Sequence, residues 1–467
     1  MSAGSVIPSE ASDTRRSYTR HVALPPGPRA PASVNTARLV VRPLESLLGW
    51  HRRYGDLFTV RFLLFGTGVY VADPEGIRQL FTGDQSDLYA GEANEPLSPV
   101  LGKNSVLILD GAEHMRQRKL LLPPFQGAAV AQWREVIREI AEAEVARWRT
   151  GDEIVARERM RTLTFDVICR AVFGVAEPDR VERLREALLA VVDSTSVIFF
   201  AEGMRRDLGP WSPWGRFKRR LAVADALIYE EIERRRRASG VEERTDVLSV
   251  LLGARDENGD PMTDVELRDE LMTMLAAGHE TTSTGLAFAV DLLLHNPVPM
   301  ARLRDELEGT DDAYLDAVVT ESLRLRPVID AAERTLKAPR TIAGWDLPAG
   351  IRVYPAIAVV HRREDLYPNA RAFRPERFLD EGAKSYTWLP FGGGIRRCIG
   401  AALAQAEMAE VLRVVLDRVE LEPISPRTDQ VVLSGITLAP RHGVRARVRR
   451  RAARPATAPT VATALAG

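Results

Sequence analysis

The run from Thr263 to Asn296 constrains the fold more than any other part of this chain. It opens with a capping box, in which Thr263 and Glu266 bond to each other's backbone N–H groups, and it stops before Pro297. A helix over this run would be about 50 Å long, enough to cross a whole domain. We therefore predict a central helix surrounded by the rest of the 467 residues, of which 45% are hydrophobic.

The remaining periodicities predict a mostly helical chain with small sheets. Most of residues 112–325 has helical spacing, whereas about 55–82 alternates β-branched and aromatic residues around a glycine and predicts a hairpin. A second β-rich stretch covers about 331–360, and short strands follow residue 418. We predict the fold class mostly α with small β-sheets (α+β). One domain would span 24–446, between a flexible N-terminal segment, 1–23, and a disordered Arg/Ala/Pro-rich tail, 447–467.

Composition excludes several classes of protein. Lysine plus arginine and aspartate plus glutamate both number 64, so the balance gives no support to a nucleic-acid partner. The two cysteines, Cys169 and Cys398, are too few for a disulfide framework or a Cys-rich zinc site and fit a reducing cytoplasm. No apolar run approaches the roughly 20 residues of a membrane-spanning helix, so we expect a cytoplasmic protein without a membrane anchor.

The loop from Phe391 to Gly400 has the strongest chemical signature. Its glycines permit backbone conformations closed to other residues and a close approach to a flat ligand. Cys398 precedes a strong helix former, whose N-terminus favours a thiolate, and Arg396 adds positive charge nearby. Such a thiolate suits a thiolate-ligated iron. From the residues alone, a nucleophilic thiol and a packed structural cysteine, the reading we give Cys169, stay equally open.

Three other patterns allow a functional and an ordinary reading. Residues 276–284 of the long helix are small and hydroxyl-rich, so they predict either a local bulge beside a flat cofactor or close packing on a neighbouring helix. Glu321 and Arg324, spaced i,i+3, form either a partly buried pair or an exposed one. His114 and Arg118, spaced i,i+4, either bind an external anion or form a solvated basic face. We assign no metal role to His279.

The loop residues carry a specific resemblance. Phe391, Gly394, Arg396, Cys398 and Gly400 match the cytochrome P450 haem-binding pattern F-x-x-G-x-R-x-C-x-G at every fixed position. Such a match would arise by chance in on the order of one chain in ten thousand. The chain resembles this family over about residues 25–446. The resemblance implies the cytochrome P450 fold, haem b as cofactor, these five residues around it, and Cys398 as the axial ligand of its iron.

The other motifs take their roles from the same resemblance. Thr281 would donate a hydrogen bond to dioxygen, and Glu280 would help to deliver protons. His114, Arg118 and, less distinctively, Arg334 would hold the haem propionates. Arg377, in a loop that matches the family, would complete a structural trio with Glu321 and Arg324.

The implied reaction is insertion of one oxygen atom of O2 into a C–H or C=C bond. Electrons would come from a ferredoxin and its ferredoxin reductase, because the chain carries no flavin or iron–sulfur site of its own. We expect a monomer. Two alternatives remain, a peroxide-driven haem-thiolate enzyme, which typically lacks the Glu280–Thr281 type of pair, and a non-catalytic haem sensor or carrier.

The substrate follows only from family positions. The pocket walls would come from Leu101–Leu107, Val197–Phe200, Met274–Ala277, Val328–Ala332 (with Ile329) and Ile436–Thr437. Most of these residues are apolar, so we predict a hydrophobic, medium-sized substrate, either a terpenoid, a fatty acyl chain, a steroid or a polyketide. Asp330 either meets a polar group of that substrate or faces outward from a loop.

Overall fold

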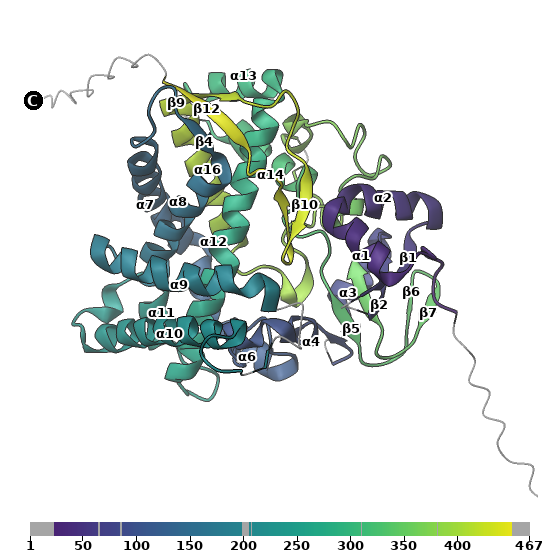
Figure 1. The fold of residues 1–467 in the computed structure, drawn as a ribbon, viewed down its shortest axis with the longest axis horizontal. Coiled ribbons are helices and arrows are strands. Elements are labelled where there is room, and N and C mark those ends of the chain that lie inside the picture. The colour runs from purple at the N-terminus through teal and green to yellow at the C-terminus, as the bar shows by residue number, and fades with distance from the viewer. Residues whose placement is uncertain are drawn as a thin grey trace, which may run out of the picture.

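The computed structural model describes residues 23–450 except 64–65, 85, 199–204, 207, 310 and 381. Figure 1 shows a larger helical part around α12 and a smaller part that combines α1 and α2 with the largest sheet. Each part has its own apolar core. The predicted fold class, mostly α with small β-sheets, is confirmed. The flexible ends that we predict lie largely outside the described residues.

The helices differ widely in length, and the longest lies at the centre. They are α1 (Ala32–Val41), α2 (Pro43–Tyr54), α3 (Pro74–Thr82), α4 (Gly91–Asn94), α5 (Ser98–Leu101), α6 (Gly111–Leu121), α7 (Gly127–Val145), α8 (Ala156–Ala171), α9 (Pro178–Ile198), α10 (Pro213–Arg237), α11 (Val247–Gly253), α12 (Asp264–Leu294), α13 (Pro297–Glu306), α14 (Ala313–Leu325), α15 (Ile357–Val360) and α16 (Ala401–Arg418).

The strands form small sheets. They are β1 (Leu57–Phe62), β2 (Gly66–Val71), β3 (Leu88–Tyr89), β4 (Glu153–Val155), β5 (Arg334–Leu336), β6 (Arg340–Ile342), β7 (Trp345–Leu347), β8 (Arg352–Pro355), β9 (Val419–Pro423), β10 (Val431–Ser434), β11 (Thr437–Pro440) and β12 (Arg445–Arg450). The largest sheet has the order β1-β2-β8-β5-β3, in which β2 and β8 are parallel and the other neighbours antiparallel. β4, β12 and β9 form a second sheet, and β6–β7 and β10–β11 are hairpins.

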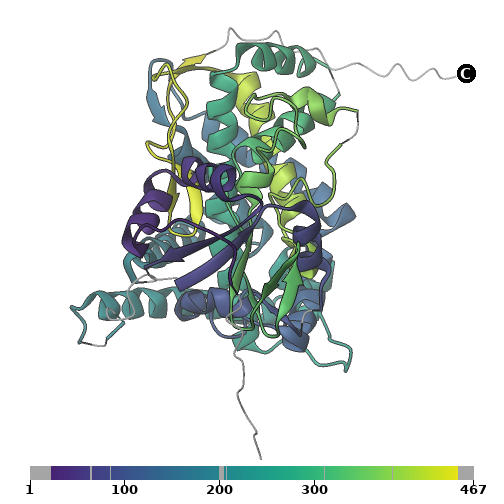
Figure 2. The same ribbon diagram turned by 90° about the vertical axis from the view of Figure 1, so that its right-hand side faces the viewer.

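Helix α12 passes through the larger part and is buried on nearly all sides (Figures 1 and 2). Its capping box forms as expected, since Thr263 and Glu266 bond to each other's backbone N–H groups. The helix is continuous over 31 residues, so the first of the two alternatives for residues 276–284, a local bulge, is wrong. A Cβ atom on Gly278 would lie 2.8 Å from the Ile168 side chain of α8. The alternative, close packing through small residues, is therefore correct at this position.

Two boundaries differ from the sequence expectations. The stretch 55–82 is a hairpin only as far as Val71, because Asp73 then caps α3 by accepting the N–H of Gly76 at 2.6 Å. Proline at the first helical position, Pro74, also favours a helix there. At the other end, β12 continues through Arg450, past the boundary at residue 446 that we predict, because it pairs with β9.

A buried ion network joins α14 to the loop before the Cys398 segment. Glu321 and Arg324 are both fully buried, and the guanidinium of Arg324 donates to both carboxylate oxygens of Glu321, at 2.5 and 2.8 Å. Arg377 donates to the same carboxylate at 3.1 Å. Arg324 also donates to the carbonyl oxygens of His361 and Ala370. Because these groups are paired on several sides, the charges are retained in the core. The exposed alternative for this pair is therefore wrong, and the pair is fully buried where we expected partial burial.

Removal of one partner from this network should leave a buried carboxylate without compensation. We expect Arg324→Met to lower the free energy of unfolding by about 3–5 kcal/mol. Arg377→Met removes fewer bonds to the network and should cost less, which keeps the test informative if the first variant does not fold. Urea denaturation checks both. Arg78→Met, which breaks the exposed Arg78–Glu75 pair, is the control and should have little effect. Equal losses for Arg324→Met and Arg78→Met would contradict this account.

Candidate functional site

The Cys398 loop is a tight, glycine-dependent turn. Gly392 and Gly394 have φ angles of +66° and +63°, which disfavour other residues. The N–H of Cys398 donates to the carbonyl oxygen of Phe391 at 3.0 Å and closes the loop. Cys398 lies three residues before α16, whose N-cap is Gly400. The side chain of Cys398 is not covered by neighbouring residues, whereas Cys169 is buried. A structural role therefore fits Cys169 but not Cys398.

The glycines approach a protein segment, where we expected a flat ligand. A Cβ atom on Gly394 would lie 1.9 Å from the carbonyl oxygen of Phe81 in α3. One on Gly393 would lie 2.4 Å from the Phe81 ring. These two glycines are required because α3 packs directly on the loop. The expected approach of the loop to a flat ligand stays a prediction.

The protein alone does not favour a thiolate at Cys398. The Cys398 side chain is not covered by direct neighbours, but it lies deep among the elements of the protein, and the resulting desolvation raises the pKa of its thiol. The N–H of Gly400 and the charges of Arg397 and Arg118 lower the pKa by less. The helix N-terminus that we expected to favour the thiolate is thus outweighed. Arg396 does not add the charge we expected at the sulfur, because it is paired with the carboxylate of Asp110. Metal coordination would still deprotonate the thiol, since a coordinating cysteine binds as its thiolate.

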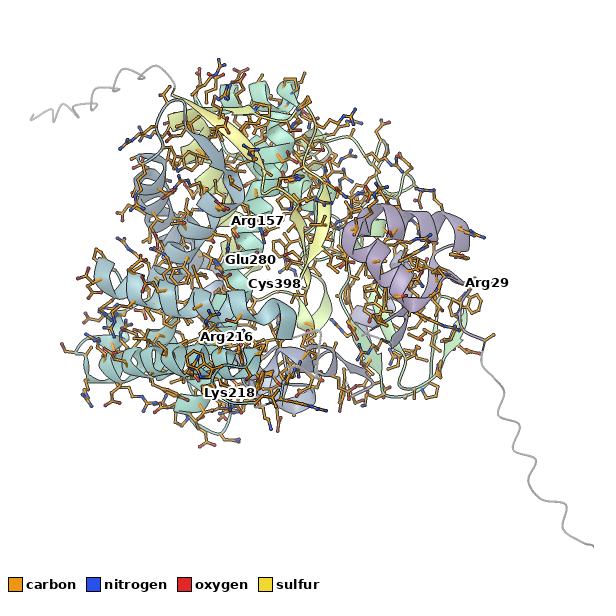
Figure 3. All side chains as sticks on the ribbon, in the orientation of Figure 1. Arg29, Arg157, Arg216, Lys218, Glu280 and Cys398 are labelled. Atoms are coloured by element: carbon orange, nitrogen blue, oxygen red, sulfur yellow. The ribbon has the colours of Figure 1, made fainter. Side chains whose placement is uncertain are left out.

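The middle of α12 presents a small-residue surface toward the interior. Ala277 is exposed, and Met274, Ala276, Gly278, Glu280 and Thr281 are half-buried, whereas the following residues from Thr282 to Leu293 are buried. The hydroxyl of Thr281 donates to the carbonyl oxygen of Ala277 at 2.6 Å. Figure 3 shows Glu280 and Cys398 in the central part of the molecule. The helix therefore offers a hydroxyl and an uncovered small side chain at its centre.

Glu280 is held by two arginines of α8. Its carboxylate pairs with the guanidinium of Arg157, seen beside it in Figure 3, and forms an ion pair with Arg161, whose Nε lies 3.1 Å from Oε2 of Glu280. Arg161 also pairs with Asp193 of α9, whose side chain is 63% exposed. These contacts connect Glu280 to the surface through charged groups. Arg157 and Arg161 could not be assigned to the site from the sequence, because their only local signal is an i,i+4 pair of basic residues on one helix.

Four basic side chains gather between α6, β5 and the Cys398 loop. They are His114, Arg118, Arg334 and Arg396. Burial and then the nearby arginines lower the pKa of His114 to about 3. Burial, together with the charge of a neighbouring arginine and against the opposing effect of Asp110, lowers the pKa of Arg334 to about 10 and that of Arg396 to about 10. The side chains of His114, Arg334 and Arg396 are thus largely buried, Arg118 is half-buried, and the charges of the cluster repel one another.

Only one carboxylate among the described residues compensates this cluster. Asp110 pairs with Arg396, whereas Arg118 and Arg334 donate to the backbone oxygens of Arg397 and Glu333. Nδ1 of His114 is buried without a hydrogen-bond partner. An excess of buried positive charge with a free imidazole nitrogen suits an anionic ligand. A flat dianion that also reaches Cys398 satisfies both features.

The comparisons with known proteins agree with this arrangement. A sequence profile for the family described as Cytochrome P450 matches residues 25–443. The chain is 39% identical over 467 residues to cytochrome P450 135B1 of Mycobacterium tuberculosis (strain ATCC 25618 / H37Rv), with 96% of each chain covered. It is 39% identical over 428 residues to cytochrome P450 135A1 of the same strain, with 91% of this chain and 95% of the relative covered. The chain belongs to the cytochrome P450 family.

Solved structures show the same fold. The retinoic acid-bound cyanobacterial protein CYP120A1 superposes with a TM-score of 0.75 at 26% identity, covering 86% of this chain and 93% of that one. The haem domain of cytochrome P450DA superposes with a TM-score of 0.79 at 24% identity, covering 92% and 98%. This P450 is therefore a haem-thiolate monooxygenase that uses O2, a redox partner and a hydrophobic substrate. Among the described residues, no helix is long and apolar enough to span a membrane.

The segments expected to line the substrate pocket come together around α12. Leu101 is buried on α5, which packs against α12, and Met274 is half-buried on α12 itself. The carbonyl oxygen of Val328 accepts the N–H of Leu438 at 2.7 Å, which joins the segment after α14 to β11. Thr437, on β11, is buried. The fold thus brings together segments that are distant in the sequence.

Other expected pocket residues differ in exposure. Ile329 is half-buried, and Ile436, in the turn between β10 and β11, is 54% exposed. Val197 lies near the end of α9, and Phe200 lies outside the described residues. Asp330 is buried, so an outward-facing loop carboxylate is wrong, and burial raises its pKa to about 6.

The buried imidazole of His279 should make folding sensitive to acid. Both of its ring nitrogens lack partners, it contacts Phe165 edge-on at 5.9 Å, and burial lowers its pKa to about 3. Below pH 6.5 the unfolded chain binds a proton that the folded protein excludes, so stability falls as the pH decreases toward 3. For His279→Gln, we expect the loss of stability between pH 7 and pH 5 to be about 2 kcal/mol smaller than for the parent. Urea denaturation at both pH values measures this difference, and an unchanged loss would contradict a neutral His279.

Proposed function

We propose that this P450 binds haem b with Cys398 as axial ligand and inserts one oxygen atom of O2 into a hydrophobic, medium-sized substrate. One observation carries this proposal. The uncovered Cys398 side chain lies in the same loop as Arg396, a member of a buried basic cluster with too few carboxylates. When bound, a thiolate-ligated haem supplies the activation of dioxygen.

The residues of the cluster would bind the propionate groups. His114 presents the unpartnered Nδ1, and Arg118 and Arg334 lack ion pairs to carboxylates within the described part of the chain. Two propionates would offset the repulsion that lowers the pKa values of Arg334 and Arg396. Phe391, Gly394 and Gly400 would shape the loop around the sulfur. In this arrangement Asp110 orients Arg396.

Glu280 and Thr281 of α12 would deliver protons from the side of the proposed haem site that faces away from the Cys398 loop. The hydroxyl of Thr281 would exchange its bond to Ala277 for one to dioxygen. Arg157 and Arg161 stay protonated and would only orient the carboxylate of Glu280, which would exchange protons with solvent water beside the exposed Asp193. Release from at least one arginine would let its carboxylate turn toward Thr281. Proton delivery would therefore depend on the α8 ion pairs.

A hydrophobic substrate fits the mostly apolar side chains of the segments that we expect to line the substrate pocket. Leu101, Met274 and Val328 offer apolar side chains, and the cyanobacterial relative was solved with retinoic acid, a hydrophobic isoprenoid acid of medium size. We propose a terpenoid, fatty acyl, steroid or polyketide skeleton that is hydroxylated at a C–H bond. The buried carboxyl of Asp330 would meet a polar group at one end of it.

A ferredoxin is the proposed electron donor. The chain has two cysteines, too few for its own cysteine-ligated iron–sulfur cluster. A hollow of about 430 Å³ beside Gly394 is lined by apolar Phe81, Leu122 and Ile395 and by the cation Lys119, which would exchange its exposed partner Glu257 for a carboxylate of the bound protein. Such a surface fits a small acidic protein by charge. A ferredoxin bound there would lie close to the Cys398 loop.

Exchange of the proposed iron ligand tests the assignment directly. We expect Cys398→Ala to lose the Soret band of the reduced carbonyl complex that is typical of thiolate ligation. It should also lose NADPH-dependent product formation with surrogate ferredoxin and reductase. Cys169→Ala, at a buried cysteine away from the loop, is the control and should keep both. Retention of both properties by Cys398→Ala would refute the assignment.

Removal of the proposed proton donor should slow turnover without affecting haem binding. We expect Glu280→Gln to reduce the rate of product formation by about 100-fold, the order typical of a positioned acid or base, and to enlarge the solvent isotope effect. A compound that shifts the Soret band in a library titration would serve as substrate. Glu135→Gln, at an exposed glutamate paired with Arg138, is the matched control. An unchanged rate would remove Glu280 from the mechanism.

A further inference from the structure

The segment between α5 and α6, residues 102–110, is tied to α12 by side chains. The carboxylate of Asp269 accepts both the backbone N–H of Asn104, at 3.0 Å, and its side-chain amide, at 2.9 Å. Gly102 has a φ angle of +87°, and a Cβ atom there would lie 1.9 Å from Oδ1 of Asp269. The hydroxyl groups of Thr273 and Ser105 are 2.7 Å apart. The segment therefore follows the surface of α12 closely.

Glu270 makes the central contact. Its Oε1 accepts the N–H of Val106 at 2.8 Å, and its side chain is fully buried. Oε2 is buried without a partner. Burial, and then the charges of Asp269 and Glu266, raise the pKa of this carboxyl well above its ordinary range. A leucine would fill this place without the penalty of an unpaired buried carboxyl. The gain that offsets the penalty is the bond to Val106.

The same residue is bound from the opposite side by the Cys398 loop. The carbonyl oxygen of Val106 accepts from Arg396 at 3.0 Å, and Leu109 and Asp110 accept from the same guanidinium. Val106 thus donates to α12 through its N–H and accepts from the Cys398 loop through its C=O. The segment links the two elements that form opposite sides of the proposed haem site.

We propose that Glu270, with Asp269, is a positioning residue that fixes the wall formed by Leu101–Leu107 and so limits the width of the substrate pocket. The proposal rests on the proposed function for the identity of that wall. Leu101 and Val106 are buried at the inner side of the segment, and Lys103 is exposed at its outer side. Loss of the hydrogen bond to Glu270 would let Val106 move away from α12 and would widen the substrate pocket. The proposed iron ligand, Cys398, would stay in place.

Two variants of Glu270 separate its role as hydrogen-bond acceptor for Val106 from its ionisable carboxyl group. Glu270→Gln keeps an oxygen that can accept the N–H of Val106, whereas Glu270→Leu leaves that N–H buried without a partner. The first readout is tryptic cleavage after Lys103 in the folded full-length protein, followed by mass spectrometry. We expect Glu270→Leu to be cleaved there about tenfold faster than the parent, and Glu270→Gln at the parental rate.

The second readout compares two azole probes by optical titration of the haem-loaded protein. Imidazole is small and reports on access to the iron, whereas phenylimidazole also contacts the pocket wall. We expect Glu270→Leu to weaken phenylimidazole binding about fivefold to tenfold, with imidazole unchanged and with the parental affinities restored in Glu270→Gln. A general loss of structure would weaken both probes together.

The matched control is Asp291→Leu on the same helix. Asp291 is also a buried carboxyl that accepts a backbone N–H, that of Asp429 at 3.0 Å, but it lies about 30 Å further along α12. If Glu270→Leu is cleaved after Lys103 no faster than Asp291→Leu, or weakens both azoles equally, the proposal is overturned. If the parent protein does not bind haem, the proposed function fails instead. The cleavage rates would then still test whether Glu270 holds residues 102–110 against α12.

Discussion

The burial of α12 on nearly all sides is the constraint on which the rest of the structure depends. A helix that crosses the protein must find a partner for every face, and α8, α14 and α16 supply these partners. Close packing at Gly278 leaves no room for a bulge, so the helix stays regular past the site. The exposed Ala277 and half-buried Thr281 belong to the less covered middle of the helix, which is followed by the fully buried stretch from Thr282 to Leu293. The site is therefore positioned by packing, and not by local distortion of the helix.

Buried charge is distributed unevenly around this helix. The Glu321–Arg324–Arg377 network is compensated by several short contacts and holds the loop that precedes the Cys398 segment. The basic cluster of His114, Arg118, Arg334 and Arg396 is not compensated in this way. The difference has a simple physical reading. A network that serves the fold satisfies its own charges, whereas a cluster that serves a ligand leaves the balance to that ligand.

The long-range hydrogen bonds of the site form one connected system. Glu280 is tied to α8, Glu270 to the segment after α5, and that segment to Arg396, two residues before the proposed iron ligand. The proposed proton-delivery residue Glu280, the proposed substrate wall and the Cys398 loop are thus all connected to α12 or to the segment after α5. The contacts of Glu270 are buried, whereas those of Glu280 reach the surface through Arg161 and Asp193.

Short residue patterns were enough to predict the family, the central helix with its cap, the Cys398 loop and the i,i+3 pairing of Glu321 with Arg324. These features are local, because each depends on residues a few positions apart whose geometry a helix or turn fixes. The partners of Glu280, the contact of Gly394 with Phe81, the burial of Asp330 and the hydrogen bond of Glu270 to Val106 became visible in the folded chain. Each of these joins segments far apart in the chain, as Glu270 and Val106 do across 164 positions. Such contacts follow from how whole elements pack, and no short pattern of residues encodes that packing.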